Sequence, residues 1–148
     1  MKNIKPILLA EDNPHDAELT LTALSELNMA NSLIVVNDGV EVMEYLCYEG
    51  KFKNRKKGNP AVILLDIKMP RMDGLEVLEM IRNNPALKLI PVVMLTSSRE
   101  EYDLHKCYKQ GVNAYVVKPV DHKEFFESVK HLGVFWALVN ELPPEIEK

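Results

Sequence analysis

The chain has 148 residues, of which 47% are hydrophobic and 27% charged, and its formal net charge is −4 at pH 7. This length and balance are typical of one globular domain with a proper core, which we expect to span residues 1–148. The mild negative charge gives no electrostatic signature for nucleic-acid binding, the start does not look like a signal peptide, and no apolar stretch approaches the ~18 residues of a membrane span.

Five short segments rich in Val, Ile and Leu are expected to form strands buried on both faces. In chain order they are Ile7–Ala10, Leu33–Val36, Val62–Leu65, Val92–Thr96 and Ala114–Val117. A helix start signal follows each of them. After the first strand, Asn13 precedes Pro14, a residue that suits the first helical position. The other four starts have the capping-box pattern, in which glutamate follows an acceptor side chain by three residues: Asp38 with Glu41, Asp73 with Glu76, Ser98 with Glu101 and Asp121 with Glu124.

Strand and helix therefore alternate five times, which predicts an α/β fold of the (βα)5 type. Crossovers between parallel strands are right-handed almost without exception. We expect a doubly wound, five-stranded parallel sheet with strand order 2-1-3-4-5, a flavodoxin-like architecture. Cys47 and Cys107 fall in predicted helices and have no metal-like spacing, so the thiols suit a reducing compartment and a cytoplasmic protein.

The segment 51–60, between the second helix and the third strand, departs from this regular plan. It carries five basic residues and one aromatic residue, Phe52. Runs of this kind are most often solvated. The alternative is a docking contact with an acidic partner surface.

The last helix is long and very apolar, and we expect it to run to Pro143 and Pro144. One face follows a helical core spacing, with Phe125, Val129, Leu132, Trp136 and Val139. Phe126, Phe135 and Leu138 widen the apolar surface beyond that face. Excess apolar surface suggests a partner, so we expect a homodimer through this helix, with Phe126, Phe135 and Trp136 as candidate contacts. Contact with a different protein and simple packing at the end of the fold are the alternatives.

Carboxylates stand at two strand ends that should meet in one crevice. Glu11 and Asp12 follow the first strand, and Asp66 follows the third. At ~4 Å and an effective dielectric constant of about 20, each pair of such charges repels by roughly 4 kcal/mol, so a positive group is expected among them. The fourth strand ends at Thr96, and the fifth is followed by Lys118, which would place both at the same crevice.

Four motifs in this order resemble response regulator receiver domains: LLAEDN at residues 8–13, LLDIKMPRMDG at 64–74, VMLTS at 93–97 and YVVKP at 115–119. The resemblance covers roughly residues 5–131, which leaves 132–148 as an apolar C-terminal extension. Finer details resemble the single-domain regulators that partner phytochrome-type histidine kinases. These details are Val36-Asn37-Asp38-Gly39, the long loop before the third strand, Cys107-Tyr108 and Phe135-Trp136.

The resemblance implies a site. Asp66 would attack a phosphohistidine of a sensor histidine kinase and become an acyl phosphate. Glu11, Asp12, Asp66 and the backbone carbonyl of Lys68 would hold Mg²⁺. Lys118 and the hydroxyl of Thr96 would contact phosphoryl oxygens. The family pattern also implies a cis peptide bond between Lys118 and Pro119.

The resemblance further implies a stand-alone switch of a phosphorelay rather than an enzyme, with only its own phosphotransfer and slow autodephosphorylation. Phosphorylation would draw Thr96 inward and let Tyr115 turn in, which repacks the surface of the fourth helix, fifth strand and fifth helix. Tyr115 as a plain packed aromatic is the alternative. If the chain is an intermediate in a relay, a downstream phosphotransfer protein would be a second partner. The kinase would be the alternative partner for the apolar surface of the last helix.

Two other classes are less consistent with the residues. A Mg²⁺-dependent phosphatase that passes through an aspartyl phosphate needs a second acid where this chain has Lys68. A flavin-binding module needs a phosphate-cradling loop after the first strand, where this chain has the acidic segment 12–16. A receiver that has lost phosphorylation would lack one of the key positions, all of which are present. None of the four histidines follows a strand, so we expect no histidine general base.

Overall fold

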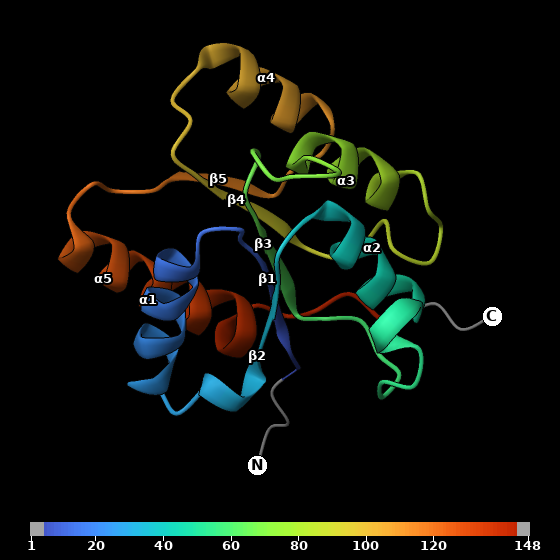
Figure 1. Cartoon of the computed structure of the whole chain (residues 1–148), viewed down its shortest axis with the longest axis horizontal. Coiled ribbons are helices and arrows are strands. Elements are labelled where there is room, and N and C mark those ends of the chain that lie inside the picture. The colour runs from blue at the N-terminus through green and yellow to red at the C-terminus, as the bar shows by residue number, and fades with distance from the viewer. Residues whose placement is uncertain (1–4, 145–148) are drawn as a thin grey trace.

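The computed structural model describes residues 5–144 and contains one five-stranded parallel sheet (Figure 1). The strand order is β2-β1-β3-β4-β5, as predicted. In the central strand β1, Leu8 lies between Ile34 and Ile63 in the parallel register. The strands are β1 (Ile7–Ala10), β2 (Leu33–Val36), β3 (Val62–Leu65), β4 (Val92–Thr96) and β5 (Ala114–Val117).

Helices cover both faces of the sheet (Figure 1). The helices α1 (Pro14–Ser25) and α5 (His122–Gly133) contact each other on one face, and α2 (Gly39–Cys47), α3 (Gly74–Arg82) and α4 (Glu101–Lys109) lie on the other. Two buried clusters follow from the strand period of two. Leu8 and Ile63 belong to the α2–α3–α4 side, and Leu9 and Leu64 belong to the α1–α5 side. Full burial of each such side chain contributes about 1.5–3 kcal/mol.

Side-chain caps begin four of the five helices. Asn13 accepts from the amides of His15 and Asp16, and Asp38 accepts from Glu41. Asp73 and Glu76 complete a capping box at α3, while Asp121 accepts from the amide of Lys123 at α5. The prediction of a Ser98 cap for α4 is wrong. That helix follows Glu100 without a side-chain cap. The Ser98 hydroxyl donates to the buried carboxylate of Asp103 at 2.7 Å and accepts from the amide of Glu100 at 3.4 Å, and neither bond satisfies an amide of the helix.

The last helix is not uniform, contrary to the prediction. α5 ends at Gly133 and the chain continues as the π-helix η3 (Val134–Val139), which lies beyond α5 without a break in the helical path. Gly133 lets this end approach α1, since a Cβ there would lie 2.6 Å from Leu24 Cδ2. Of the proposed dimer contacts, Phe126 and Trp136 pack partly buried against the α1–α5 core, and only Phe135 is exposed. Much of the additional apolar surface of the last helix is therefore buried within the chain.

The basic loop after α2 is organised by its own arginine. It includes the short 3-10 helix η2 (Gly50–Phe52), and the Arg55 guanidinium carbon lies 3.9 Å from the ring centroid of Tyr45 and 4.1 Å from that of Tyr48. Arg55 Nε also donates to the Tyr45 carbonyl at 2.7 Å. A second short 3-10 helix, η1 (Ala30–Ser32), precedes β2. Between residues 5 and 144, no helix combines the length and the apolar character needed to cross a membrane.

The two thiols are expected to differ in reactivity. Cys107 of α4 is fully buried, and burial raises the pKa of its thiol to about 11, whereas Cys47 is exposed. Because the thiolate is the nucleophile, iodoacetamide at mildly alkaline pH should modify the native protein once, at Cys47. Intact mass measures the number of additions. Cys47→Ser should abolish the addition, and unfolding in urea should expose the second thiol. Two additions to the native wild-type protein would contradict the burial of Cys107.

Candidate metal centre

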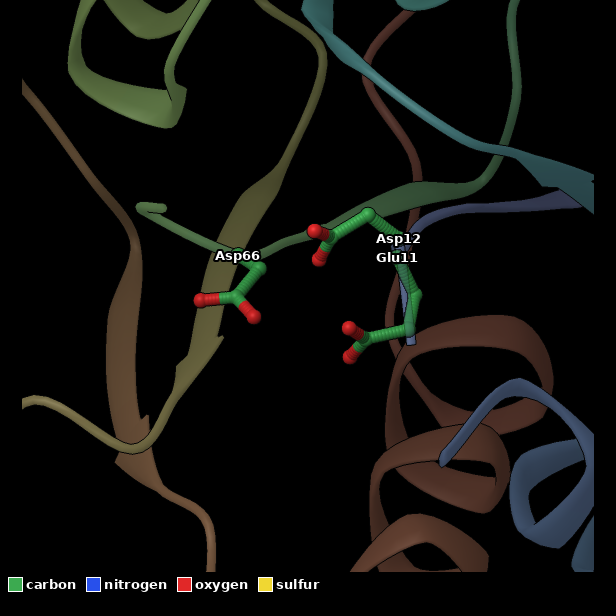
Figure 2. Close-up of side chains that lie close together, drawn as sticks. All are labelled: Glu11, Asp12 and Asp66. Carbon is green, nitrogen blue, oxygen red and sulfur yellow. The ribbon is translucent and has the colours of Figure 1, made fainter. Parts of the chain in front are cut away.

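Three carboxylates meet at the ends of β1 and β3 (Figure 2). One oxygen from each of Glu11, Asp12 and Asp66 lies within 4.8 Å of the others. Figure 2 shows the three side chains facing a common space, with Glu11 and Asp12 coming from β1 and Asp66 from the end of β3. Glu11 and Asp66 are buried and Asp12 is exposed, so the cluster opens to solvent on one side. The structure thus brings together the three carboxylates that the sequence singled out.

Lys118 is the positive group that the sequence predicted among these acids. Its ammonium nitrogen contacts the Glu11 carboxylate and lies 3.0 Å from Asp66 Oδ2 and 3.1 Å from Asp16 Oδ2. Sequence reasoning missed Asp16. The signal was available, because Pro14 at the first helical position places Asp16 in the first turn of α1, immediately after the strand that ends at Glu11.

The lysine and the buried glutamate perturb each other. Burial raises the pKa of Glu11, and the hydrogen bond from Lys118 opposes that shift. Burial alone would lower the pKa of Lys118, but its hydrogen bond to Glu11 and the charges of Asp66 and Glu11 raise it above its ordinary value. The Lys118 side chain therefore remains an ammonium at neutral pH and offers three N–H donors to the site.

The residues fit a divalent cation. Glu11, Asp12, Asp16 and Asp66 carry four formal negative charges, and Lys118 carries one positive charge. Carboxylate oxygens are hard donors, the type that Mg²⁺, Mn²⁺ and Ca²⁺ prefer. A dication offsets most of the remaining repulsion. Lys68 and Asp12 line one open groove between the segment after β3 and the start of α4.

Two glycines hold the segment that follows Asp66. Gly74 donates its amide to the Ile67 carbonyl at 2.8 Å, and a Cβ on Gly74 would lie 2.2 Å from the Asp66 carbonyl oxygen. Gly39 plays the same role farther along, since its Cβ would lie 2.2 Å from the Met72 carbonyl oxygen. These two close approaches, from the start of α3 and the start of α2, therefore fix the path of the chain after Asp66.

An ion pair reinforces this arrangement. Arg71, which has a left-handed backbone at φ 64°, donates through Nε to Asp38 Oδ2 at 2.7 Å. Burial would raise the pKa of Asp38, but the hydrogen bond from Arg71 and the backbone amides at the start of α2 lower it. Asp38 thus caps α2 and anchors the segment between β3 and α3 with one carboxylate.

Thr96 and Tyr115 lie on adjacent strands and share one neighbour. Thr96 is buried at the end of β4, and its hydroxyl oxygen accepts from the amide of Ser98 at 3.3 Å. The Tyr115 hydroxyl donates to the carbonyl of Ser98 at 3.0 Å. Ser98 in turn donates to Asp103 of α4. A displacement of Thr96 therefore has a direct polar route to both Tyr115 and α4.

The predicted cis peptide bond is wrong. Residues 5–144 contain no cis peptide bond, so Lys118 and Pro119 are joined in the trans form. The trans isomer of an X-Pro bond is intrinsically favoured by roughly 0.5–1 kcal/mol. With that isomer, Lys118 already contacts Glu11, Asp16 and Asp66.

Comparison with known proteins agrees with this geometry. The family model of the response regulator receiver domain matches residues 7–130. Response regulator Rcp1 from Synechocystis sp. is 39% identical over 139 residues, which cover 94% of this chain and 93% of Rcp1. The structure of its Mn²⁺-bound form covers 95% of this chain and 99% of Rcp1, with a TM-score of 0.84 at 38% identity.

Two further solved structures are phytochrome response regulators. The phosphorylated cyanobacterial protein RcpA has a TM-score of 0.89 at 39% identity and covers 96% of this chain and 100% of its own. The bacteriophytochrome response regulator AtBRR is 56% identical, with a TM-score of 0.74 and coverage of 95% of this chain and 100% of its own. The resemblance predicted from the four motifs is confirmed, and the chain belongs to the response regulator receiver domain family.

Proposed function

We propose that this chain is a phosphorylation-controlled switch that accepts a phosphoryl group on Asp66 from a sensor histidine kinase. The observation that carries this is the setting of Asp66, whose carboxylate lies 3.0 Å from the Lys118 ammonium and within 4.8 Å of two other acids. One Asp66 oxygen forms the new O–P bond while the P–N bond of the phosphohistidine breaks. The electron pair of that bond returns to the imidazole nitrogen.

The remaining side chains stabilise the charge that gathers on the phosphoryl oxygens. Lys118 donates to one oxygen as a fixed positive charge, and the Thr96 hydroxyl donates to another. Mg²⁺, when bound by Glu11, Asp12, Asp66 and the carbonyl of Lys68, supplies charge neutralisation for the acids and the phosphoryl group. The acidic cluster and the Mn²⁺-bound form of the related Rcp1 support a divalent metal here.

The output is a change at the surface of α4, β5 and α5. Movement of Thr96 toward the phosphoryl group breaks its hydrogen bond with the amide of Ser98, which lies in the segment that leads into α4. It also leaves space for Tyr115, whose hydroxyl donates to the carbonyl of Ser98, to turn in. α4 is weakly anchored, with only Asp103 and Cys107 buried, so it can shift. A change from 1:99 to 99:1 in two populations needs about 5.5 kcal/mol. Three new hydrogen bonds to charged groups, each worth about 2 kcal/mol within the usual range of about 1.5–3 kcal/mol, supply this free energy.

The partners follow from the family and from the relatives. The similarity to RcpA and AtBRR, which are phytochrome response regulators, favours a phytochrome-type histidine kinase. A cytoplasmic setting and a phosphotransfer protein as a second recipient are further parts of the proposal. The chain acts as a switch rather than as an enzyme on outside substrates, because Lys68 stands where an aspartyl-phosphate phosphatase carries its second acid.

Removing the divalent cation is expected to slow phosphorylation by at least about tenfold, because the acids then face the incoming phosphoryl group with only Lys118 to offset them. Phosphoramidate, which has the same P–N bond as phosphohistidine, serves as the donor, and intact mass measures the product. EDTA should suppress the reaction, and Mg²⁺ or Mn²⁺ should restore it. Asp12 is an exposed ligand, and phosphorylation of Asp12→Asn should increase only weakly when metal is added. The control Glu18→Gln should respond to metal as the wild type does. Equal labelling in EDTA would contradict the metal role.

We also propose homodimerisation through the exposed apolar side chains of η3, which are Phe135, Leu138 and Val139. Phe135→Glu is expected to convert a dimer into a monomer, because a charge at this position would be buried without a partner. Light scattering at several concentrations, with and without beryllium fluoride, measures the mass. Met80→Glu, at an exposed position of α3 on the other side of the sheet, is the matched control. A wild-type monomer under both conditions would rule out this dimer.

A further inference from the structure

Asp16 is a fourth acid that competes for the active-site lysine. The Lys118 ammonium lies 3.1 Å from Asp16 Oδ2, almost the same distance as its 3.0 Å contact with Asp66, and it also contacts Glu11. The Asp16 side chain is only 23% exposed and the Lys118 side chain 9% exposed, so solvent does not dominate this pair. An ammonium has three N–H donors. In this arrangement each donor faces a carboxylate, and a phosphoryl oxygen can gain one only by displacing a carboxylate.

The charge of Asp16 also differs from the charges of the other acids in the positive group that can offset it. Glu11, Asp12 and Asp66 each have an oxygen in the common metal-binding group, whereas Asp16 does not belong to that group. Lys118 is its ion-pair partner. When Lys118 turns toward a phosphoryl group, the Asp16 carboxylate therefore loses its compensating charge, while the charges of the other acids remain offset by the metal.

The charge balance gives the direction of the effect. Forming the acyl phosphate removes the single negative charge of Asp66 and adds a phosphoryl group of about −1.5 to −2, so the site becomes more negative by up to about one charge. Beryllium fluoride bound to the Asp66 carboxylate likewise adds one negative charge. A fixed carboxylate on Asp16 repels that added charge and holds back the lysine that would offset it.

We propose that Asp16 is a positioning residue that holds Lys118 before phosphorylation and opposes its transfer to the phosphoryl group, so that the phosphorylated state is less stable than the other site residues would make it. This rests on the proposed function of Asp66. The competing explanation is local, because an acid in the first turn of α1 stabilises a helix start through the helix dipole. That role would leave ligand binding unchanged.

Asp16→Asn separates the two explanations, because it keeps the size of the side chain and an acceptor oxygen but removes the charge. At saturating Mg²⁺, we expect the variant to bind beryllium fluoride about five to ten times more tightly than the wild type. This change in affinity corresponds to the repulsion by one charge at a distance of several ångströms in a medium of intermediate dielectric constant. Its Mg²⁺ affinity in the absence of beryllium fluoride should fall a few-fold, because a negative charge near the cation is lost. NMR titration measures both constants.

Glu18→Gln is the matched control. It removes the same charge from an exposed position of the same helix and should leave both constants within about twofold of the wild type. The ε-methylene resonance of Lys118 in the ligand-free protein should shift in Asp16→Asn and stay in place in Glu18→Gln. Asp16→Ser, which also suits a helix start, should reproduce the direction of both changes if the asparagine variant folds poorly.

The outcomes are distinguishable. Unchanged constants in Asp16→Asn, with normal binding by the wild type, would overturn the inference and leave the role of Asp66 intact. Weaker beryllium fluoride binding by the variant would also overturn it, because Asp16 would then orient Lys118 toward the phosphoryl group rather than oppose the transfer. A wild-type protein that binds neither Mg²⁺ nor beryllium fluoride would overturn the inference together with the proposed function.

Discussion

Asp66→Asn protein is expected to take up no phosphoryl group from phosphoramidate or from a phosphorylated kinase. The amide of asparagine is a poor nucleophile, and its replacement should lower the rate of acyl phosphate formation by at least about 10³-fold, as for other nucleophile deletions. The substitution is close to isosteric, so the fold should persist. Intact mass after incubation with the donor and Mg²⁺ measures the product.

Asp121→Asn is the control for this experiment. Asp121 is an exposed aspartate that caps α5 through the amide of Lys123, and asparagine caps a helix start equally well. This variant should be phosphorylated like the wild type. Full labelling of Asp66→Asn, in contrast, would show that another residue accepts the phosphoryl group, and the assignment of the site would be wrong.

Gly74→Ala is expected to destabilise the protein, although the same change in an ordinary helix stabilises it by about 0.5–1 kcal/mol. The new methyl group would lie 2.2 Å from the Asp66 carbonyl oxygen and 2.9 Å from Ile67 Cα. Both are backbone atoms that cannot rotate away. Overpacking of this kind typically costs about 1–3 kcal/mol, and we expect the upper end of that range. Urea unfolding, followed by far-UV circular dichroism, measures the loss.

The same substitution should also impair the chemistry, because relief of the clash moves the backbone that carries Asp66. A displacement of about 1 Å can cost on the order of 10²-fold in rate. Phosphorylation of the folded fraction by phosphoramidate measures this effect. Met80→Ala, at an exposed position of the same helix, is the control and should change stability by no more than about 0.5 kcal/mol. A Gly74→Ala variant more stable than the wild type would contradict the close approach.

The secondary structure could be predicted where the signal is local. Each strand is a short apolar run covered on both faces, so burial and β-propensity agree, and all five strands have the predicted bounds. Asn13, Asp38 and Asp73 cap helices through amides only two or three residues away, a relation that the sequence displays directly. Ser98 fails because α4 begins later, after Glu100, and the Ser98 hydroxyl lies between the Glu100 amide and the Asp103 carboxylate instead.

The last helix shows a similar limit. Its apolar pattern predicted one continuous α-helix with unpartnered surface. Gly133, where the α-helix ends and the π-helix follows, lies against Leu24 of α1, a contact across more than a hundred residues. The burial of Phe126 and Trp136 and the exposure of Phe135 depend on this tertiary packing, which the spacing of apolar residues does not reveal.

The amino-acid sequence by itself determined the alternation of strands and helices, the family, and the acids that meet at the strand ends, because these depend on apolar periodicity, on caps and on the parallel direction of the strands. Only the tertiary structure decided which carboxylates share the ammonium of Lys118 and where the backbone leaves no room for a side chain. Asp16 reaches Lys118 across 102 positions of sequence, and Gly74 approaches the carbonyl of Asp66. The physical reason is that such contacts have ångström tolerances set by the packing of whole elements, for which no local pattern carries a signal.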